Sequence, residues 1–169
     1  MQRVRLAGNH YWIISMNFEN LIADTADQYK LPIKLVKAIV QVESDGNAWA
    51  IRYEIDFYTR YVAGKHYKVF PGCSFTTEGQ MRACSFGLMQ IMGQVARELG
   101  FDRPFLTELC NPAIGLEWGC KKLVQQIERY NGNLESVVAA YNAGSARHDA
   151  SGRLHNQVYV DKVRAAGGL

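Results

Sequence analysis

Apolar residues recur at three- and four-residue intervals along most of this chain, which is the spacing of one face of an α-helix. A first helix is predicted from Phe18 to Tyr29, and Pro32 suits the first turn of a second helix that runs to about Glu43. Further helices are predicted over residues 85–99, 112–130, 134–143 and 158–166. We find no convincing succession of alternating strands, so the predicted fold class is mainly α.

Cap residues support the boundaries of these helices. Asn111 precedes Pro112, which is a cap followed by a first-turn proline, and Asn133 is placed to cap the next helix. Gly100 and Gly144 stand where the helices before them should end, because glycine readily adopts the left-handed conformation of a C-terminal cap. The helix pattern is therefore consistent with its own start and stop signals.

The composition is that of one ordinary globular domain. The chain has 169 residues and a formal charge of +3, and its Lys and Arg are scattered, so nucleic-acid binding is not expected. We expect a monomeric single domain over residues 17–169, behind an N-terminal extension at residues 1–16. The apolar stretch at residues 11–14 is too short for a signal peptide, and no run approaches the roughly 20 apolar residues that span a bilayer. We therefore expect no integral membrane segment.

The cysteines occur as two local pairs, Cys73 with Cys84 and Cys110 with Cys120. Each pair would suit a disulfide if the protein meets an oxidising compartment, and four buried thiols are the alternative. The sequence has neither a CxxC spacing nor a neighbouring His cluster, so no metal site is expected.

Glu43 is unusual because it shares a helix face with apolar residues. Val36, Ile39 and Val40 stand seven, four and three positions before it. Desolvation on such a face would raise the pKa of the carboxyl, and the negative end of the helix dipole acts in the same direction. These are the conditions of a general acid. The alternative is a glutamate at the edge of the core, snorkelling or paired with an arginine.

Three separated motifs occur along the chain. They are Glu43-Ser44 with Asn47 and Ala50 after it, Ser85-Phe86-Gly87-Leu88-Met89-Gln90-Ile91-Met92, and Ala140-Tyr141-Asn142-Ala143-Gly144. Together, and in this order, they resemble the Glu-Ser, Gly-Leu-Met-Gln-Ile-Met and Ala-Tyr-Asn-Ala-Gly elements of the lytic transglycosylase and goose-type lysozyme family. The resemblance implies a lysozyme-like helical domain with a substrate groove.

The resemblance also implies roles for individual side chains. Glu43 would be the catalytic acid, and Gln90 and Met92 would line the sugar groove beside it. Tyr141 and Asn142 would close the groove from the opposite wall and contact the substrate or the acid.

Smaller and apolar motif positions have less specific expectations. Ser44 and Ser85 would hydrogen-bond near the scissile bond or the muramyl peptide. Gly87 suits either a close approach of the backbone to sugar or plain helix packing. Leu88 and Met89 are expected in the core, because apolar residues at helical spacing usually pack there.

The chain departs from compact family members in two places. Ala48 stands where the family commonly has a proline, which leaves the acid untouched. A long insertion, at about residues 55–83, is rich in aromatic and basic residues and separates Glu43 from Ser85. It would form either an aromatic, basic wall over the glycan groove or a small subdomain packed on the core. The run Arg52-Tyr53-Glu54 looks like one found in bacteriophage relatives, which makes Glu54 a candidate substrate-binding residue.

The function implied by the resemblance is that of a peptidoglycan lytic transglycosylase, most like a bacteriophage endolysin, which binds glycan strands and needs no metal or organic cofactor. Glu43 alone would cleave the β-1,4 bond between MurNAc and GlcNAc and leave 1,6-anhydroMurNAc ends. One alternative is a goose-type-like lysozyme that hydrolyses this bond with Glu54 or Asp56 as an extra acid. Another is a non-catalytic glycan-binding module. An endolysin would pass from the host cytoplasm to the periplasm and cell wall; otherwise the cell envelope is the expected location.

Overall fold

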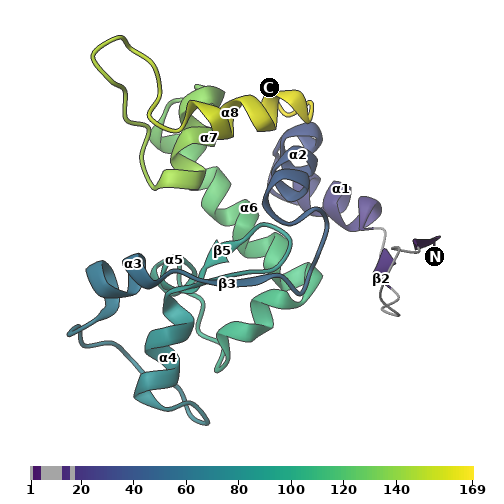
Figure 1. Ribbon diagram of the computed structural model, residues 1–169. Helices are drawn as coiled ribbons and strands as arrows, with labels where there is room; N and C mark the ends of the chain where they lie inside the picture. The colour runs from purple at the N-terminus through teal and green to yellow at the C-terminus, as the bar shows by residue number, and fades with distance from the viewer. Residues whose placement is uncertain (1, 5–12, 16–17) are drawn as a thin grey trace.

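The computed structural model describes residues 2–4, 13–15 and 18–169 (Figure 1). In chain order its elements are β1 (Gln2–Val4), β2 (Ile13–Ser15), α1 (Glu19–Gln28), α2 (Ile33–Ser44), β3 (Ile51–Tyr53), α3 (Ile55–Phe57), the π-helix η1 (Tyr58–Val62), α4 (Phe75–Arg82), β4 (Cys84–Phe86), β5 (Ile91–Met92), α5 (Gly93–Glu98), the 3-10 helix η2 (Leu106–Cys110), α6 (Pro112–Arg129), α7 (Leu134–Ala143) and α8 (Gln157–Ala165). Helices dominate, which confirms the predicted mainly α fold. β1 and β2 pair antiparallel within the N-terminal extension.

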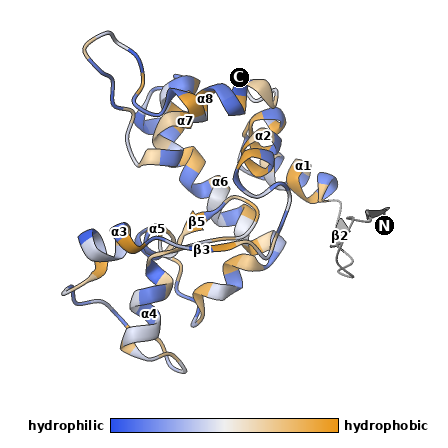
Figure 2. Ribbon diagram, in the orientation of Figure 1, coloured by the Kyte–Doolittle hydropathy of each residue, from blue (hydrophilic) through white to orange (hydrophobic). Residues whose placement is uncertain are grey.

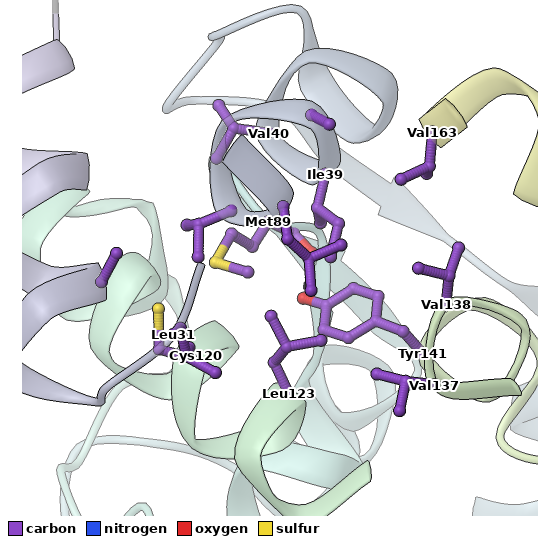
Figure 3. Packing of buried hydrophobic residues seen from close by; sticks show 14 of the residues in the cluster. Leu31, Ile39, Val40, Met89, Cys120, Leu123, Val137, Val138, Tyr141 and Val163 are labelled. Atoms are coloured by element: carbon purple, nitrogen blue, oxygen red, sulfur yellow. Dashed lines mark hydrogen bonds between the residues drawn. The ribbon is translucent and has the colours of Figure 1, made fainter. Parts of the chain in front are cut away.

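We call α1, α2, α6, α7 and α8 the helical region, because they surround the larger hydrophobic core (Figure 1). Fully buried members of this core include Leu35, Ile39, Leu123, Val138 and Val163, which come from four different helices. Figure 3 shows the side chains of Ile39, Leu123, Val138 and Val163 converging from those helices. Hydrophobic residues are prominent on α2, whereas the loop that joins α7 to α8 is largely hydrophilic (Figure 2).

Most predicted helix boundaries in the helical region are confirmed. The Asn111 side chain accepts hydrogen bonds from the first turn of α6, and Asn133 accepts one from Ser136 N at 3.0 Å. Gly144 ends α7 with a left-handed backbone, at φ +76°. α2 begins at Ile33, one residue later than expected, so Pro32 is its N-cap and not part of its first turn.

The helix predicted over residues 85–99 is wrong in its first half. β3, β4 and β5 form a three-stranded antiparallel sheet in that order, and a turn at residues 87–90 joins β4 to β5. Only α5 is helical in this stretch. The chain cannot continue as a helix here, because both Gly87 and Gln90 have positive φ angles, +68° and +44°. The apolar spacing that suggested a helix instead comes from buried strand residues and a turn whose Leu88 and Met89 enter the core, as expected for that pair.

Gly87 is required by a close backbone approach. A Cβ at this position would lie 2.5 Å from the carbonyl oxygen of Leu109, which belongs to η2. The helix-packing interpretation of Gly87 is therefore wrong, and the neighbour that demands glycine is protein backbone. This contact fixes the β4–β5 turn against η2 and the start of α6.

We call β3, β4, β5 and the elements packed with them, α3, η1, α4, α5 and η2, the sheet region (Figure 1). It has its own smaller hydrophobic core, with Phe86, Ile91, Phe101 and Leu109 buried. The insertion belongs to this region and has internal packing, since the Tyr67 ring stacks on Phe75 with centroids 4.4 Å apart. The segment thus carries structure of its own, and its contribution to glycan binding stays a prediction.

A buried ion cluster attaches the insertion to the rest of the sheet region. Glu78 of α4 is 1% exposed, and Arg97 of α5 donates to both of its carboxylate oxygens, at 2.8 and 3.0 Å. Arg82 Nε lies 3.0 Å from the same carboxylate. Arg97 also donates to the carbonyl oxygens of Phe101 and Arg103, so one side chain joins α4, α5 and the following loop.

All four cysteines are free thiols in the structure, so neither expected disulfide is formed in it. Cys110 lies in the core of the sheet region and Cys120 in that of the helical region. Burial raises the pKa of the Cys120 thiol to about 12, which suppresses the reactive thiolate. Within the described part of the chain, no helix is both long and apolar enough to cross a membrane.

Candidate active site

Glu43 lies in the last turn of α2, where the helical region meets the sheet region. Val36, Ile39 and Val40, the apolar residues on its helix face, are all buried, as the sequence predicted. The Glu43 side chain is half-buried, and its Oε1 accepts a hydrogen bond of 2.6 Å from the hydroxyl of Tyr159 on α8. The acid is thus held by a residue 116 positions away in the sequence.

Burial raises the pKa of the Glu43 carboxyl above its usual value. Three neighbours oppose this shift: the hydrogen bond from Tyr159, the ammonium of Lys122 and the guanidinium of Arg52. The carboxyl therefore stays more readily protonated than an exposed one, while the surrounding donors and positive charges can receive its anion. A group that first gives and then takes a proton needs both properties.

Lys122 is a buried cation near the acid. It comes from α6, and its Nζ donates to the backbone oxygen of Tyr141 at 2.6 Å and lies 4.1 Å from the centre of the Tyr141 ring. Burial lowers the pKa of Lys122 to about 8, and the nearby charge of Glu43 works against that shift. A positive charge is thereby kept near Glu43 at neutral pH, although desolvation of the ammonium opposes it.

Tyr141 lies in the core and not on an open groove wall. Its side chain is 1% exposed, and its hydroxyl donates to the backbone oxygen of Met89 at 2.8 Å. Figure 3 shows the ring among Leu123, Val137 and Val138, with its hydroxyl towards Met89. The expected place of Tyr141 on the groove wall is therefore corrected: its ring is buried and fixes the β4–β5 turn against α7. The alternative expectation, that Tyr141 contacts the acid, stays a prediction.

The serine after the acid makes a second tie to this turn. Ser44 Oγ donates to the carbonyl oxygen of Leu88 at 2.8 Å and also lies within reach of Val40 O. Gly87 N donates to Ala50 O at 2.8 Å, so the turn is tied to the chain entering β3 as well. The role of Ser44 in the structure is to join the end of α2 to the sheet region, which fixes the position of Glu43 relative to the sheet.

Ser85 of β4 and Gln90 of the β4–β5 turn form a polar pair. Ser85 Oγ donates to Gln90 Oε1 at 2.8 Å, and Gln90 Nε2 donates to the carbonyl oxygens of Ala50 and Gly87, both at 3.0 Å. Ser85 is 2% exposed, whereas Gln90 and Met92 are partly exposed. Of these predicted groove residues, Gln90 and Met92 thus have side-chain surface open to solvent, whereas Ser85 is buried against Gln90.

The remaining predicted residues lie at the exposed rim. Asn142, after Tyr141 on α7, accepts a hydrogen bond of 3.0 Å from Asn156 Nδ2, just before α8. Glu54 follows β3 and forms an ion pair with the exposed Arg52. Asp56 is exposed in α3. Glu43, by contrast, is withdrawn from solvent, so the structure gives the candidate carboxylates different environments.

Two residues next to the acid were missed by the sequence reasoning, Tyr159 and Lys122. Lys122 follows Trp118 and Gly119 by four and three positions, so the criterion that singled out Glu43, a charge on a buried helix face, could have found it. Tyr159 had no comparable signal, because its role depends on how α8 packs against α2. Within the described ranges, no three His, Cys, Asp or Glu side chains gather closely enough to hold a metal ion.

A mainly helical domain beside a small antiparallel sheet, with a glutamate withdrawn from solvent where they meet, defines the lysozyme-like class of folds. Comparison with known families is more specific, since residues 20–159 match the model described as the transglycosylase SLT domain. The match covers most of the chain, and the protein therefore belongs to the SLT transglycosylase family. It is a lytic transglycosylase, an enzyme that acts on peptidoglycan.

Proposed function

We propose that this enzyme cleaves the β-1,4 bond between MurNAc and GlcNAc with Glu43 as its single catalytic carboxyl. The observation that carries the proposal is the environment of Glu43: a half-buried carboxyl with a raised pKa, which accepts a hydrogen bond from Tyr159 and lies near the ammonium of Lys122. Gln90, Met92 and Asn142 are proposed to contact the glycan, while Ser44, Ser85 and Tyr141 position the groups that do.

The proposed reaction has two steps. Glu43 first gives its proton to the glycosidic oxygen that leaves with GlcNAc, while the acetamido oxygen of MurNAc attacks C1 and takes the place of a second carboxylate. The Glu43 carboxylate then takes the proton of the O6 hydroxyl, and O6 attacks C1 and releases the acetamido oxygen. The carboxyl is restored and a 1,6-anhydro bond is formed, with no water consumed.

Hydrolysis by an extra acid is the main alternative outcome. Glu54 and Asp56 were the candidates for such an acid, since a second carboxylate could activate water. Glu54 forms its ion pair with Arg52, and Asp56 lies in the exposed helix α3. Neither shares the enclosed environment of Glu43, which favours the transglycosylase outcome.

Mass analysis of the products from purified peptidoglycan tests the proposal directly. Digestion in ¹⁸O water should leave the new muramyl ends unlabelled and in the anhydro form, and N-deacetylated peptidoglycan should resist cleavage. Substantial ¹⁸O incorporation that is abolished by Glu54→Gln or Asp56→Asn would instead establish a lysozyme. Binding without any cleavage would leave the non-catalytic glycan-binding module.

We further propose that the biological role is lysis of a bacterial host by a bacteriophage. The support is the run Arg52-Tyr53-Glu54, which resembles one in phage relatives, together with a mild positive charge suited to an anionic cell envelope. Expression in a bacterial host together with a membrane-permeabilising protein should cause lysis, and the Glu43→Gln variant should not. Intact cells in both cultures would remove the proposed role in lysis while leaving the enzymatic activity in place.

A further inference from the structure

Arg52 shares one face of the sheet with two residues proposed for the active site. In the antiparallel pairing, Arg52 lies opposite Ser85 of β4, and Ser85 lies opposite Met92 of β5. Directly opposed residues project to the same face of a sheet, so these three side chains belong to one face. Ile51 and Tyr53 project to the other face, opposite Phe86 and Cys84 of the sheet-region core.

The sheet that carries Arg52 is tied to the end of α2, where Glu43 lies. The hydrogen bonds from Ser44 to Leu88 O and from Gly87 N to Ala50 O join the end of α2, the β4–β5 turn and the entry to β3. The positive charge of Arg52 is accordingly one of those that act on the Glu43 carboxyl. A glycan placed with its scissile bond at Glu43 therefore passes close to the Arg52 side chain.

The guanidinium of Arg52 is oriented by one hydrogen bond and keeps further donors that could bind a ligand. Its Nε donates to Glu54 Oε1, while its side chain is 71% exposed. Over residues 18–169, no group hydrogen-bonds to its two terminal nitrogens. That free edge of the guanidinium is the one that binds a carboxylate through two parallel hydrogen bonds. Holding Nε with Glu54 reduces the freedom that such binding would otherwise cost.

We infer that Arg52 is a recognition residue for the carboxylates of the stem peptides carried by MurNAc, and that Glu54 positions it. The inference rests on the proposed function, because Glu43 locates the muramyl sugar. The glycan backbone itself is uncharged, and its acidic groups lie on the peptide attached to the lactyl group of MurNAc. An exposed cation beside the acid thus meets the anionic part of the substrate. Glu54 acts on the orientation of Arg52 and not on water.

Peptidoglycan with neutralised stem carboxylates distinguishes recognition of those carboxylates by Arg52 from an effect of the Arg52 charge on Glu43. Amidation of the stem carboxylates with a carbodiimide and ammonia removes their charge and leaves the glycan intact. Wild-type kcat/KM should fall about three- to tenfold on the amidated polymer, the range expected for an exposed charge-assisted hydrogen bond. Arg52→Gln should show a similar fall on native polymer and no further fall on amidated polymer. Arg52→Lys should lie between them, since it keeps the charge without the planar fork.

Control variants show whether a different result contradicts carboxylate recognition by Arg52 or the proposed catalytic role of Glu43. Lys34→Gln removes an exposed charge at the far end of α2 and should keep the wild-type preference for native polymer. Equal losses by Arg52→Gln on both polymers, with a shifted pH profile, would overturn the inference and assign Arg52 to tuning Glu43. Sedimentation with peptidoglycan in a Glu43→Gln background tests recognition without catalysis. In that background, the protein should bind native polymer more tightly than amidated polymer only when Arg52 is present. This measurement therefore distinguishes a failure of carboxylate recognition from a failure of the proposed chemistry.

Discussion

Glu43 of the helical region and Glu54 of the sheet region lie in different environments. In the helical region, Glu43 is withdrawn from solvent, and burial raises its pKa. In the sheet region, Glu54 is at an exposed edge and paired with Arg52. Desolvation of the kind that surrounds Glu43 favours the protonated form of a carboxyl, which is the form that a general acid needs. Packing around each glutamate, and not the residue type, thus distinguishes the two carboxyl groups.

Replacing each glutamate by glutamine is the strongest test of this difference. Glu43→Gln should fold normally and lose about 10²- to 10⁴-fold in turnover, because general acid catalysis is typically worth that much. Glu54→Gln should lose about tenfold or less, since it disturbs an exposed ion pair. Initial rates of anhydromuropeptide release measure both. Comparable losses in the two variants, or near-wild-type turnover in Glu43→Gln, would remove the distinction.

Glu78 extends the comparison, because it is buried in the sheet region but ion-paired with Arg82 and Arg97. Glu78→Gln would leave two buried guanidinium groups without their counter-charge, so the free energy of unfolding should fall by about 3–5 kcal/mol. Urea unfolding measures the change. Glu128→Gln, at an exposed position of α6, should change the free energy of unfolding by less than about 0.5 kcal/mol. A loss as small as that control would mean that the ion cluster does not secure the insertion.

The two regions also differ in how far their structure could be predicted from sequence. The helical region has long helices with caps such as Asn111 and Asn133, so periodicity and capping point to the same boundaries. The sheet region consists of strands of two or three residues. Such strands are too short for alternation to be seen in the sequence. Leu88 and Met89 lie in a turn between two of these strands, and together with the buried strand residues they produce an apolar spacing that resembles that of a helix.

The residues of the candidate site also differ in how far they could be predicted from sequence. Glu43 could be found because its apolar neighbours lie on its own helix, and the motifs around Gln90 and Asn142 supplied the rest. Tyr159 could not, since the bond to Glu43 joins residues 116 positions apart. Tyr141 lies in the core and not on the expected groove wall, because a motif gives residue identity but does not show which way a side chain points.

The effect of burying a charge in the helical region can be measured at Lys122 through the pH dependence of the free energy of unfolding. Its folded-state pKa of about 8 is below the ordinary 10.5, so between these values the unfolded chain binds more protons at this group than the folded one. The contribution of Lys122 to the free energy of unfolding is therefore least favourable below pH 8 and increases up to about pH 10.5. Relative to Lys122→Met, wild-type stability should rise by roughly 3 kcal/mol at most over this window.

Urea unfolding at several pH values would show this slope. Lys121→Met is the matched control, because the neighbouring Lys121 side chain reaches solvent and pairs with Glu117 at 2.7 Å. The free energy of unfolding of the Lys121→Met variant should change with pH as that of the wild type does across the same window. Parallel curves for wild type and Lys122→Met would show that the ammonium is not desolvated, and would weaken the contrast between the two regions.

Tyr159→Phe is the mildest test, and it separates the orientation of Glu43 from its burial. The lost hydrogen bond stabilised the ionised carboxylate, so its removal should raise the Glu43 pKa further. A general acid works while protonated, and the alkaline limb of the pH–rate profile should therefore move to higher pH. At neutral pH, turnover should still fall about tenfold, because a charge-assisted hydrogen bond no longer holds the carboxyl in place.

The two effects of Tyr159→Phe have opposite consequences at high pH, which makes the pH profile more informative than one rate. Tyr130→Phe is the control, since its hydroxyl also makes a hydrogen bond, from Ala146 N at 2.9 Å, but does not bind Glu43. That variant should keep the wild-type profile. If Tyr159→Phe moved the alkaline limb to lower pH, Tyr159 would have to stabilise the protonated carboxyl, and the acid would be tuned by this hydrogen bond and not by the burial that the helical region provides.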